Sequence, residues 1–133
     1  MLESCVTIAH EADIIASRQA GRDIARQLGM GTADQTRVAT AISELARNAW
    51  QYAGGGVCRV EGERENGHVV LRVEVADEGP GIADVDQAMQ DGFSTGRGLG
   101  AGLPGTRRLM DDLHIETVPG RTVIRATMRR VRR

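Results

Sequence analysis

The chain has 133 residues, which suits one compact domain, and its 17 basic and 18 acidic residues leave a formal net charge of −1. This balance excludes a general attraction to nucleic acid or anionic lipid. Every basic residue is an arginine, which excludes a Walker phosphate loop and a eukaryotic-type protein kinase site, because both need a lysine. No apolar segment approaches the roughly 20 residues of a membrane span, and no signal peptide is recognisable. A single cytoplasmic domain over residues 1–133 is predicted.

The first part of the chain predicts one strand and two helices. Ser4–Ala9 has the pattern of a short strand, and apolar residues then recur at helical spacing as far as Gly29. A second helix is expected over Thr32–Ala53, because three glycines follow it. Thr32 and Gln35 form a capping-box pattern, in which each side chain satisfies a backbone donor at the start of the helix.

The second part of the chain predicts four strands and two more helices. Two strands are joined by an Asn-Gly turn, a strong hairpin signal. In chain order we expect strands Val57–Arg64 and His68–Asp77, a short helix near Asp84–Gln90, a glycine-rich loop, a helix from Pro104 to about Asp112, and a hairpin of Ile115–Val118 and Thr122–Arg129. This order favours an α+β fold, a two-layer sandwich with helices on one face of a mixed, mostly antiparallel sheet.

The second helix carries the first candidate site. Its core stripe falls at Val38, Ile42, Leu45 and Ala49. Glu44 and Asn48 belong to a neighbouring stripe and point the same way, because they are four residues apart. A carboxylate can accept a proton from a hydroxyl, and an asparagine oxygen suits Mg²⁺. The alternative is an ordinary solvated helix flank.

The end of the second hairpin strand carries another candidate site. Asp77 ends an apolar strand, and Gly79 and Gly81 follow it. An aspartate at this position, beside glycines that permit close approach, can accept a hydrogen bond from an exocyclic amine such as that of adenine. The alternative is a plain turn, because Asp and Gly favour turns in any case.

Residues 92–105, GFSTGRGLGAGLPG, contain six glycines and form the third candidate site. The last six residues match G-x-G-x-x-G, but no strand precedes them, so a dinucleotide-binding fold is excluded. The loop leads into a helix that starts near Pro104, and the free amides of a helix start suit phosphate. Arg97 and Arg107 are nearby cations. A mobile surface loop is the alternative for this segment alone, but the three sites together describe ATP from base to phosphates.

These motifs resemble those of a known superfamily. Glu44-Leu45-x-x-Asn48-Ala49, Asp77-x-Gly79-x-Gly81 and Gly100-x-Gly102 resemble the N, G1 and G2 boxes of the GHKL ATPases, which share the Bergerat fold. The segments TRVATAISELARN, ADEGPGI and DGFSTGRGLGAGLPGTRRLMDD are similar to the stressosome switch kinases (RsbT type) among the anti-sigma-factor serine kinases.

The resemblance implies a role for each motif residue. Glu44 would be the base that orients or deprotonates the acceptor hydroxyl, and Asn48 would hold Mg²⁺. Asp77 would bind the adenine amine. The other implied nucleotide contacts are Gly79 and Gly81 around the purine, and Arg97, Gly98, Gly100, Ala101 and Gly102 near the phosphates.

The resemblance also implies partners. The acceptor would be a serine or threonine of a STAS-domain antagonist or scaffold protein, and the released kinase would activate a serine/threonine phosphatase. A homodimer is compatible with the sequence, whereas nucleic-acid and membrane partners are not expected. Three alternatives stay open: a kinase that sequesters a sigma factor directly, a binding module without catalysis, and nucleic-acid binding through the arginines of Arg129–Arg133.

Overall fold

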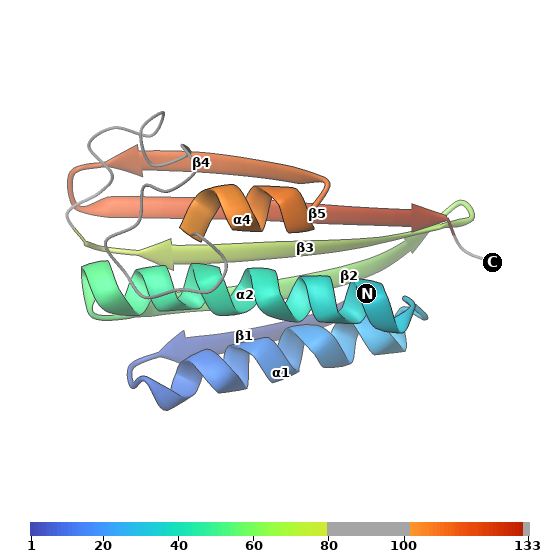
Figure 1. Cartoon of the computed structure of the whole chain (residues 1–133), viewed down its shortest axis with the longest axis horizontal. Coiled ribbons are helices and arrows are strands. Elements are labelled where there is room, and N and C mark those ends of the chain that lie inside the picture. Colours follow the sequence, from blue (N-terminus) through green and yellow to red (C-terminus); the bar gives the residue numbers. More distant parts are fainter. Residues whose placement is uncertain (80–101, 132–133) are drawn as a thin grey trace.

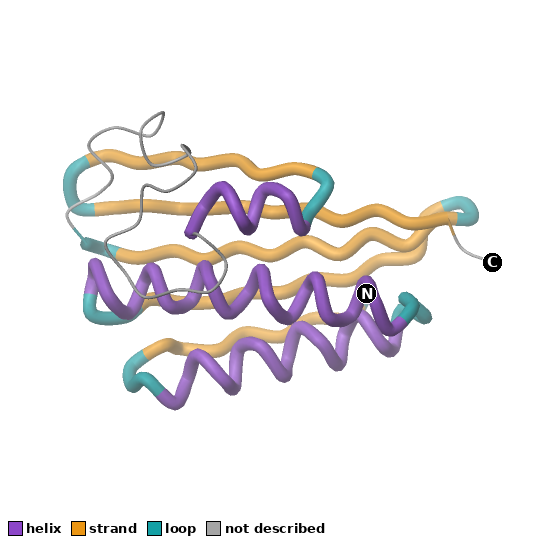
Figure 2. Tube along the Cα trace, viewed as in Figure 1, coloured by secondary structure: helices purple, strands orange, loops and turns teal. Residues whose placement is uncertain are grey.

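The computed structural model describes residues 1–79 and 102–131, and its helices lie together on one face of a sheet (Figures 1 and 2). The elements are β1 (Leu2–Ile8), α1 (Ala12–Gln27), α2 (Thr32–Ala53), β2 (Gly56–Glu65), β3 (His68–Asp77), α4 (Gly102–Leu109), β4 (Asp112–Val118) and β5 (Arg121–Val131). This arrangement is the predicted α+β sandwich of two layers.

The sheet has five strands in the order β1-β2-β3-β5-β4, and every neighbouring pair is antiparallel. The Asn-Gly turn between β2 and β3 has positive φ at both residues, 39° at Asn66 and 82° at Gly67. Such a turn matches the twist of the flanking strands, so the hairpin that the sequence predicts is confirmed.

The core lies between the sheet and the helices. Side chains of β3 alternate between the two faces of the sheet, and Leu71, Val73 and Val75 are buried on the face that the helices cover. The predicted stripe of α2 packs against this face: Val38, Ile42, Leu45 and Ala49 are all at most 1% exposed. Helices α1 and α2 pack closely because Gly21 of α1 has no side chain. The Ile42 side chain of α2 occupies the space that a Cβ atom on Gly21 would need.

Some predicted details are wrong. The capping box does not form, because Gly31 is the N-cap of α2 and the Gln35 side chain donates instead to the Met30 carbonyl oxygen, at 3.0 Å. Helix α4 begins at Gly102 and ends at Leu109, whereas the predicted helix ran from Pro104 to about Asp112. Strand β4 therefore starts at Asp112 instead of Ile115. The predicted short helix near Asp84–Gln90 lies outside the described residues.

Candidate active site

The structure describes half of the predicted site residues. Glu44 and Asn48 lie on α2, Asp77 ends β3, Gly79 follows it, and Gly102 begins α4. The others, Gly81, Arg97, Gly98, Gly100 and Ala101, lie outside the described residues. In Figure 1, the end of α2, the end of β3 and the first turn of α4 all face the same end of the molecule, on the left.

The end of β3 is held against the end of α2. The Asp77 carboxylate accepts a hydrogen bond from the Gly79 backbone N–H at 3.0 Å, which closes a tight turn. A Cβ atom on Gly79 would lie 2.5 Å from the Ala53 Cβ atom and 2.9 Å from its Cα atom. The backbone can therefore come this close to α2 only because residue 79 has no side chain.

Thr122 is a site neighbour that the sequence analysis did not identify. It pairs with Asp77 across β3 and β5, and directly opposite residues in a sheet point to the same face. Its side chain is buried, and its hydroxyl lies 2.8 Å from the Thr117 hydroxyl on β4. No local sequence signal could have found it, because the pairing depends on the register of strands 45 residues apart.

Glu44 is buried beside an arginine. Its side chain is 7% exposed, and its Oε1 atom accepts a hydrogen bond from Arg47 Nη1 at 3.0 Å. A solvated helix flank, the alternative interpretation, is therefore wrong for this residue. Burial of a carboxylate without a partner is costly, so the neighbouring guanidinium is part of the reason that Glu44 can stay there.

The described site residues follow one another along α2. Ala53, which contacts Gly79, comes five residues after Asn48 and nine after Glu44. At the rise of an α-helix, Asn48 lies about 8 Å and Glu44 about 13 Å along the axis from the Ala53 end. The turn at Asp77 and Gly79, then Asn48, then Glu44 therefore lie in this order from the Ala53 end of α2.

The remaining described residues limit how phosphate and metal could be held. Arg107, named from the sequence as a nearby cation, is exposed in the last turn of α4, away from the amides at the helix start. Within residues 1–79 and 102–131, no group of three or more histidine, cysteine or acidic side chains could hold a metal ion. Asn48 could contribute only one ligand, which fits Mg²⁺ because this ion usually keeps waters and substrate phosphates around it.

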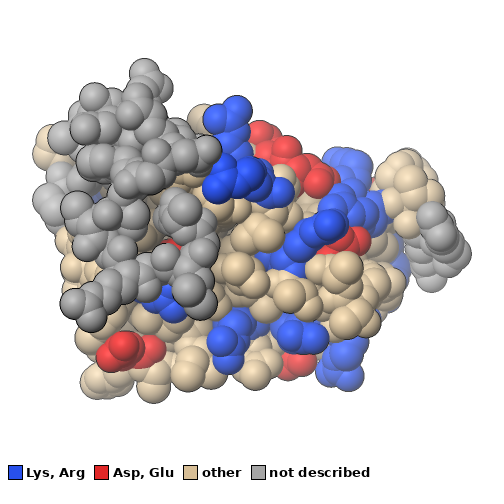
Figure 3. Space-filling view, in the orientation of Figure 1, with Lys and Arg blue, Asp and Glu red and all other residues tan. Residues whose placement is uncertain are grey.

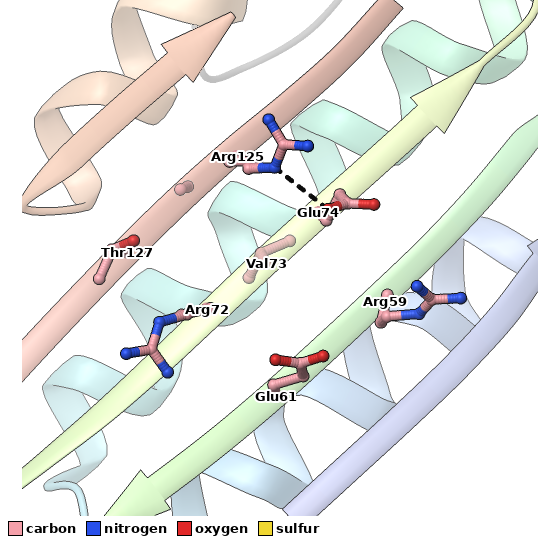
Figure 4. A pocket seen from close by; sticks show the side chains of 8 residues that line it. Arg59, Glu61, Arg72, Val73, Glu74, Arg125 and Thr127 are labelled. Atoms are coloured by element: carbon pink, nitrogen blue, oxygen red, sulfur yellow. Dashed lines mark hydrogen bonds and ion pairs between the residues drawn. The ribbon is translucent and has the colours of Figure 1, made fainter. Parts of the chain in front are cut away.

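A different hollow lies on the face of the sheet that the helices leave open. It has a volume of about 200 Å³ and is lined by charged side chains of β2, β3 and β5, including Arg59, Glu61 and Arg72 (Figure 4). None of the predicted site residues lines it. Because it is shallow and carries charges of both signs, it does not suit a nucleotide base.

Residues 8–128 match the family described as the histidine kinase-like ATPase domain, and the chain belongs to this family. Serine/threonine-protein kinase RsbT of Bacillus subtilis is 52% identical over 118 residues, which cover 89% of each chain. The anti-sigma F factor of Caldanaerobacter subterraneus is 33% identical over 103 residues, which cover 68% of this chain and 66% of that protein. The chain is therefore an ATP-binding enzyme of the serine/threonine protein kinase class.

Solved structures support the fold. The structure of the RsbU and RsbW domains of a Mycobacterium tuberculosis protein matches with a TM-score of 0.69 at 21% identity, covering 100% of this chain and 34% of that one. The catalytic domain of the histidine kinase ThkA matches with a TM-score of 0.56 at 20% identity, covering 96% and 95%. None of the helices in the described residues is long and apolar enough to cross a membrane.

Proposed function

We propose that this enzyme transfers the γ-phosphate of ATP to a serine or threonine of a STAS-domain antagonist or scaffold protein, in a bacterial partner-switching pathway of the cytoplasm. When it is released from that protein, it binds and activates a serine/threonine phosphatase. The observation that carries the proposal is that the turn at Asp77 and Gly79 packs against the Ala53 end of α2, the helix that carries Asn48 and Glu44. The 52% identity to a serine/threonine-protein kinase supports the same conclusion.

Each described residue has a proposed task in the reaction. Asp77 accepts a hydrogen bond from the adenine amine, and Gly79 leaves room for the base. The Asn48 side-chain oxygen is a ligand for Mg²⁺, which neutralises phosphate charge when it is bound. The other proposed nucleotide contacts come from Gly81 and from the glycine-rich segment before α4, which includes Arg97.

Glu44 completes the transfer as the base. Its carboxylate takes the proton of the acceptor hydroxyl while the hydroxyl oxygen forms a bond to the γ-phosphorus. The bond from that phosphorus to the β–γ bridging oxygen breaks, and ADP leaves. Because the transition state is loose, positioning and charge neutralisation supply most of the catalysis, so few side chains are needed.

Calorimetric titration of ATP, with and without Mg²⁺, tests the nucleotide site. We expect saturable binding that depends on Mg²⁺ and loses this dependence in Asn48→Ala. Ser43→Ala is a matched control, because Ser43 lies on the same helix and its hydroxyl donates to the Ala39 carbonyl oxygen within that helix. Absence of binding at millimolar ATP would contradict the proposal.

Transfer of radiolabelled γ-phosphate tests the acceptor. Purified STAS-domain proteins of the source organism are incubated with the kinase and ATP, and labelling of one of them is the expected result. Glu44→Gln should bind ATP normally but transfer the phosphate at least about 100-fold more slowly, as expected for loss of a general base. An unchanged transfer rate would remove Glu44 from this role.

Direct sequestration of a sigma factor is the second candidate function, because relatives named anti-sigma F factor are 32–33% identical. Copurification distinguishes the two. A STAS-domain protein and a phosphatase bound to the chain favour the first proposal, whereas a sigma factor favours the second.

A further inference from the structure

We propose that Arg47 is a positioning residue for Glu44, which fixes one carboxylate oxygen and leaves the other available to the acceptor hydroxyl. The inference rests on the proposed function, because it takes Glu44 as the base. It concerns a contact that the sequence motifs do not include, since Arg47 lies at one of the variable positions of Glu44-Leu45-x-x-Asn48.

The ion pair is asymmetric in its exposure. The Glu44 side chain is 7% exposed, whereas that of Arg47 is 35% exposed, and Arg47 Nη1 lies 3.0 Å from Glu44 Oε1. The arginine therefore reaches from the edge of the surface to a carboxylate that is almost removed from water. A hydrogen bond between two charged groups in such a place is strong and directional, so it restricts how the carboxylate can turn.

No residue that the structure describes donates a hydrogen bond to the second oxygen of Glu44. Within residues 1–79 and 102–131, Arg47 is the only residue that donates a hydrogen bond to Glu44, and it does so to Oε1. No fully buried side-chain oxygen in the same residues lacks a partner, so Oε2 is not completely enclosed by them. The carboxylate thus has one oxygen that is paired with Arg47 and one to which no described residue donates.

A second ion pair on α2 shows what a purely structural carboxylate looks like. Arg37 and Asp34 have the same spacing, with Nη1 3.1 Å from Oδ1. Asp34, however, also accepts hydrogen bonds from Arg130 of β5, at 2.9 Å on Oδ2 and 3.3 Å on Oδ1. Both of its oxygens are occupied, and it ties the helix to the sheet, whereas Glu44 keeps one oxygen for a reactant.

This arrangement fits the proposed reaction. The proton of the acceptor hydroxyl passes to Oε2 while the new bond to phosphorus forms, and Arg47 keeps its own protons throughout because a guanidinium does not deprotonate in proteins. Misplacement of a reacting group by as little as 1 Å can cost roughly 100-fold in rate. A Glu44 carboxylate that could rotate freely would often be misplaced, and phosphate transfer would be slower.

Three variants test the role, with ATP affinity and single-turnover transfer measured separately on the acceptor that the labelling assay identifies. Arg47→Gln should transfer phosphate roughly 10- to 100-fold more slowly, while its ATP dissociation constant stays within about twofold of that of the unmodified kinase. Arg47→Lys should recover most of the rate, because an ammonium can also pair with Glu44. Arg37→Gln, the matched control, should transfer at the unmodified rate.

A double variant shows whether Arg47 acts through Glu44. Glu44→Gln with Arg47→Gln should be no slower than Glu44→Gln alone. The inference would be overturned if the losses of rate in the double variant were additive, or if Arg47→Gln transferred phosphate at the unmodified rate. It would also be overturned if Arg47→Lys were as slow as Arg47→Gln, or if Arg47→Gln lost ATP affinity in parallel with its rate. Two other results would contradict the proposed function itself: the unmodified kinase would not bind ATP, or Glu44→Gln would transfer phosphate at the full rate.

Discussion

The two faces of the sheet differ in what their side chains do. On the face that the helices cover, Leu71, Val73 and Val75 of β3 are at most 2% exposed. On the open face, the same strand presents Arg72 and Glu74, which form ion pairs with residues of neighbouring strands. Figure 2 shows that no described helix covers this second face.

The open face is nevertheless organised. Arg72 bridges Glu63 and Glu65, and Arg125 bridges Glu74 and Glu116, at 2.9–3.4 Å. These side chains are about one third to more than one half exposed, so each pair contributes little to stability. The covered face therefore holds the fold together and ends at the candidate site, whereas the open face presents charged side chains to solvent.

The outer surface of the helical layer differs again. The described helices carry seven arginines and four acidic side chains, and Figure 3 shows that blue patches outnumber red ones on this side of the molecule. A surface with this excess of arginine favours the approach of an anionic ligand.

The largest difference between the two faces should come from a substitution in the core. Leu71→Ala, on the covered face, removes a side chain that is 0% exposed, and should lower the free energy of unfolding by about 2–5 kcal/mol through lost burial and a cavity. Urea denaturation followed by circular dichroism measures the change. A loss below about 1 kcal/mol would show that the neighbouring core side chains move to fill the cavity at position 71.

The two cysteines allow a test by pH. Cys58 lies on the covered face, where burial raises the pKa of its thiol to about 12, against an ordinary value of 9.0. Between these values the folded thiol keeps its proton and the unfolded one loses it, so stability falls as pH rises above about 9, by about 1.4 kcal/mol per unit. Urea denaturation from pH 7 to 10.5, compared with Cys58→Ala, measures this loss.

In Cys58→Ala, the free energy of unfolding should fall less steeply above about pH 9, by the slope that the Cys58 thiol contributes. If the free energy of unfolding had the same pH dependence in both proteins, Cys58 would not be the group responsible. Cys5 lies exposed on the open face and gives an internal control. Under native conditions a thiol reagent should modify Cys5 quickly and Cys58 only after unfolding. Rapid modification of both thiols would mean that the covered face opens readily.

A smaller effect is expected where the covered face ends at the candidate site. Gly79→Ala places a methyl group 2.5 Å from the Ala53 Cβ atom, and should cost about 1–3 kcal/mol by overpacking. Because α2 must then move away from β3, ATP affinity should fall as well. Gly31→Ala is the control, since nothing lies within 4 Å of an added Cβ atom there. Normal ATP binding by Gly79→Ala would separate this contact from the nucleotide site.

The smallest effect is expected on the open face. A hydrogen bond from the Arg125 guanidinium holds the pKa of the Glu116 carboxyl below its ordinary value. Arg125→Gln should let this pKa rise toward normal, as followed by NMR titration, while the urea midpoint stays within experimental error because the pair is exposed. A large fall in the midpoint that persists at high salt would show that the open face also holds the fold together.

Several elements of this protein follow from local patterns in its sequence. The Asn-Gly turn specified a hairpin, the alternation in His68–Asp77 specified a strand with one buried face, and the α2 stripe from Val38 to Ala49 specified a core helix. These patterns are local, and their periods of 2 and 3.6 residues are set by backbone geometry. The motifs around Glu44, Asn48 and Asp77 likewise predicted the family, which the comparisons confirm.

How these elements pack against one another depends on contacts that form only in the folded protein. Thr122 stands beside Asp77 because β5 lies next to β3, and Gly79 touches Ala53 because the sheet packs under α2. The same packing buries Glu44 so that Arg47 becomes its partner, although the helix pattern also allowed an exposed flank. Burial and strand register arise from contacts between residues far apart in the chain, so no local pattern of residues contains them.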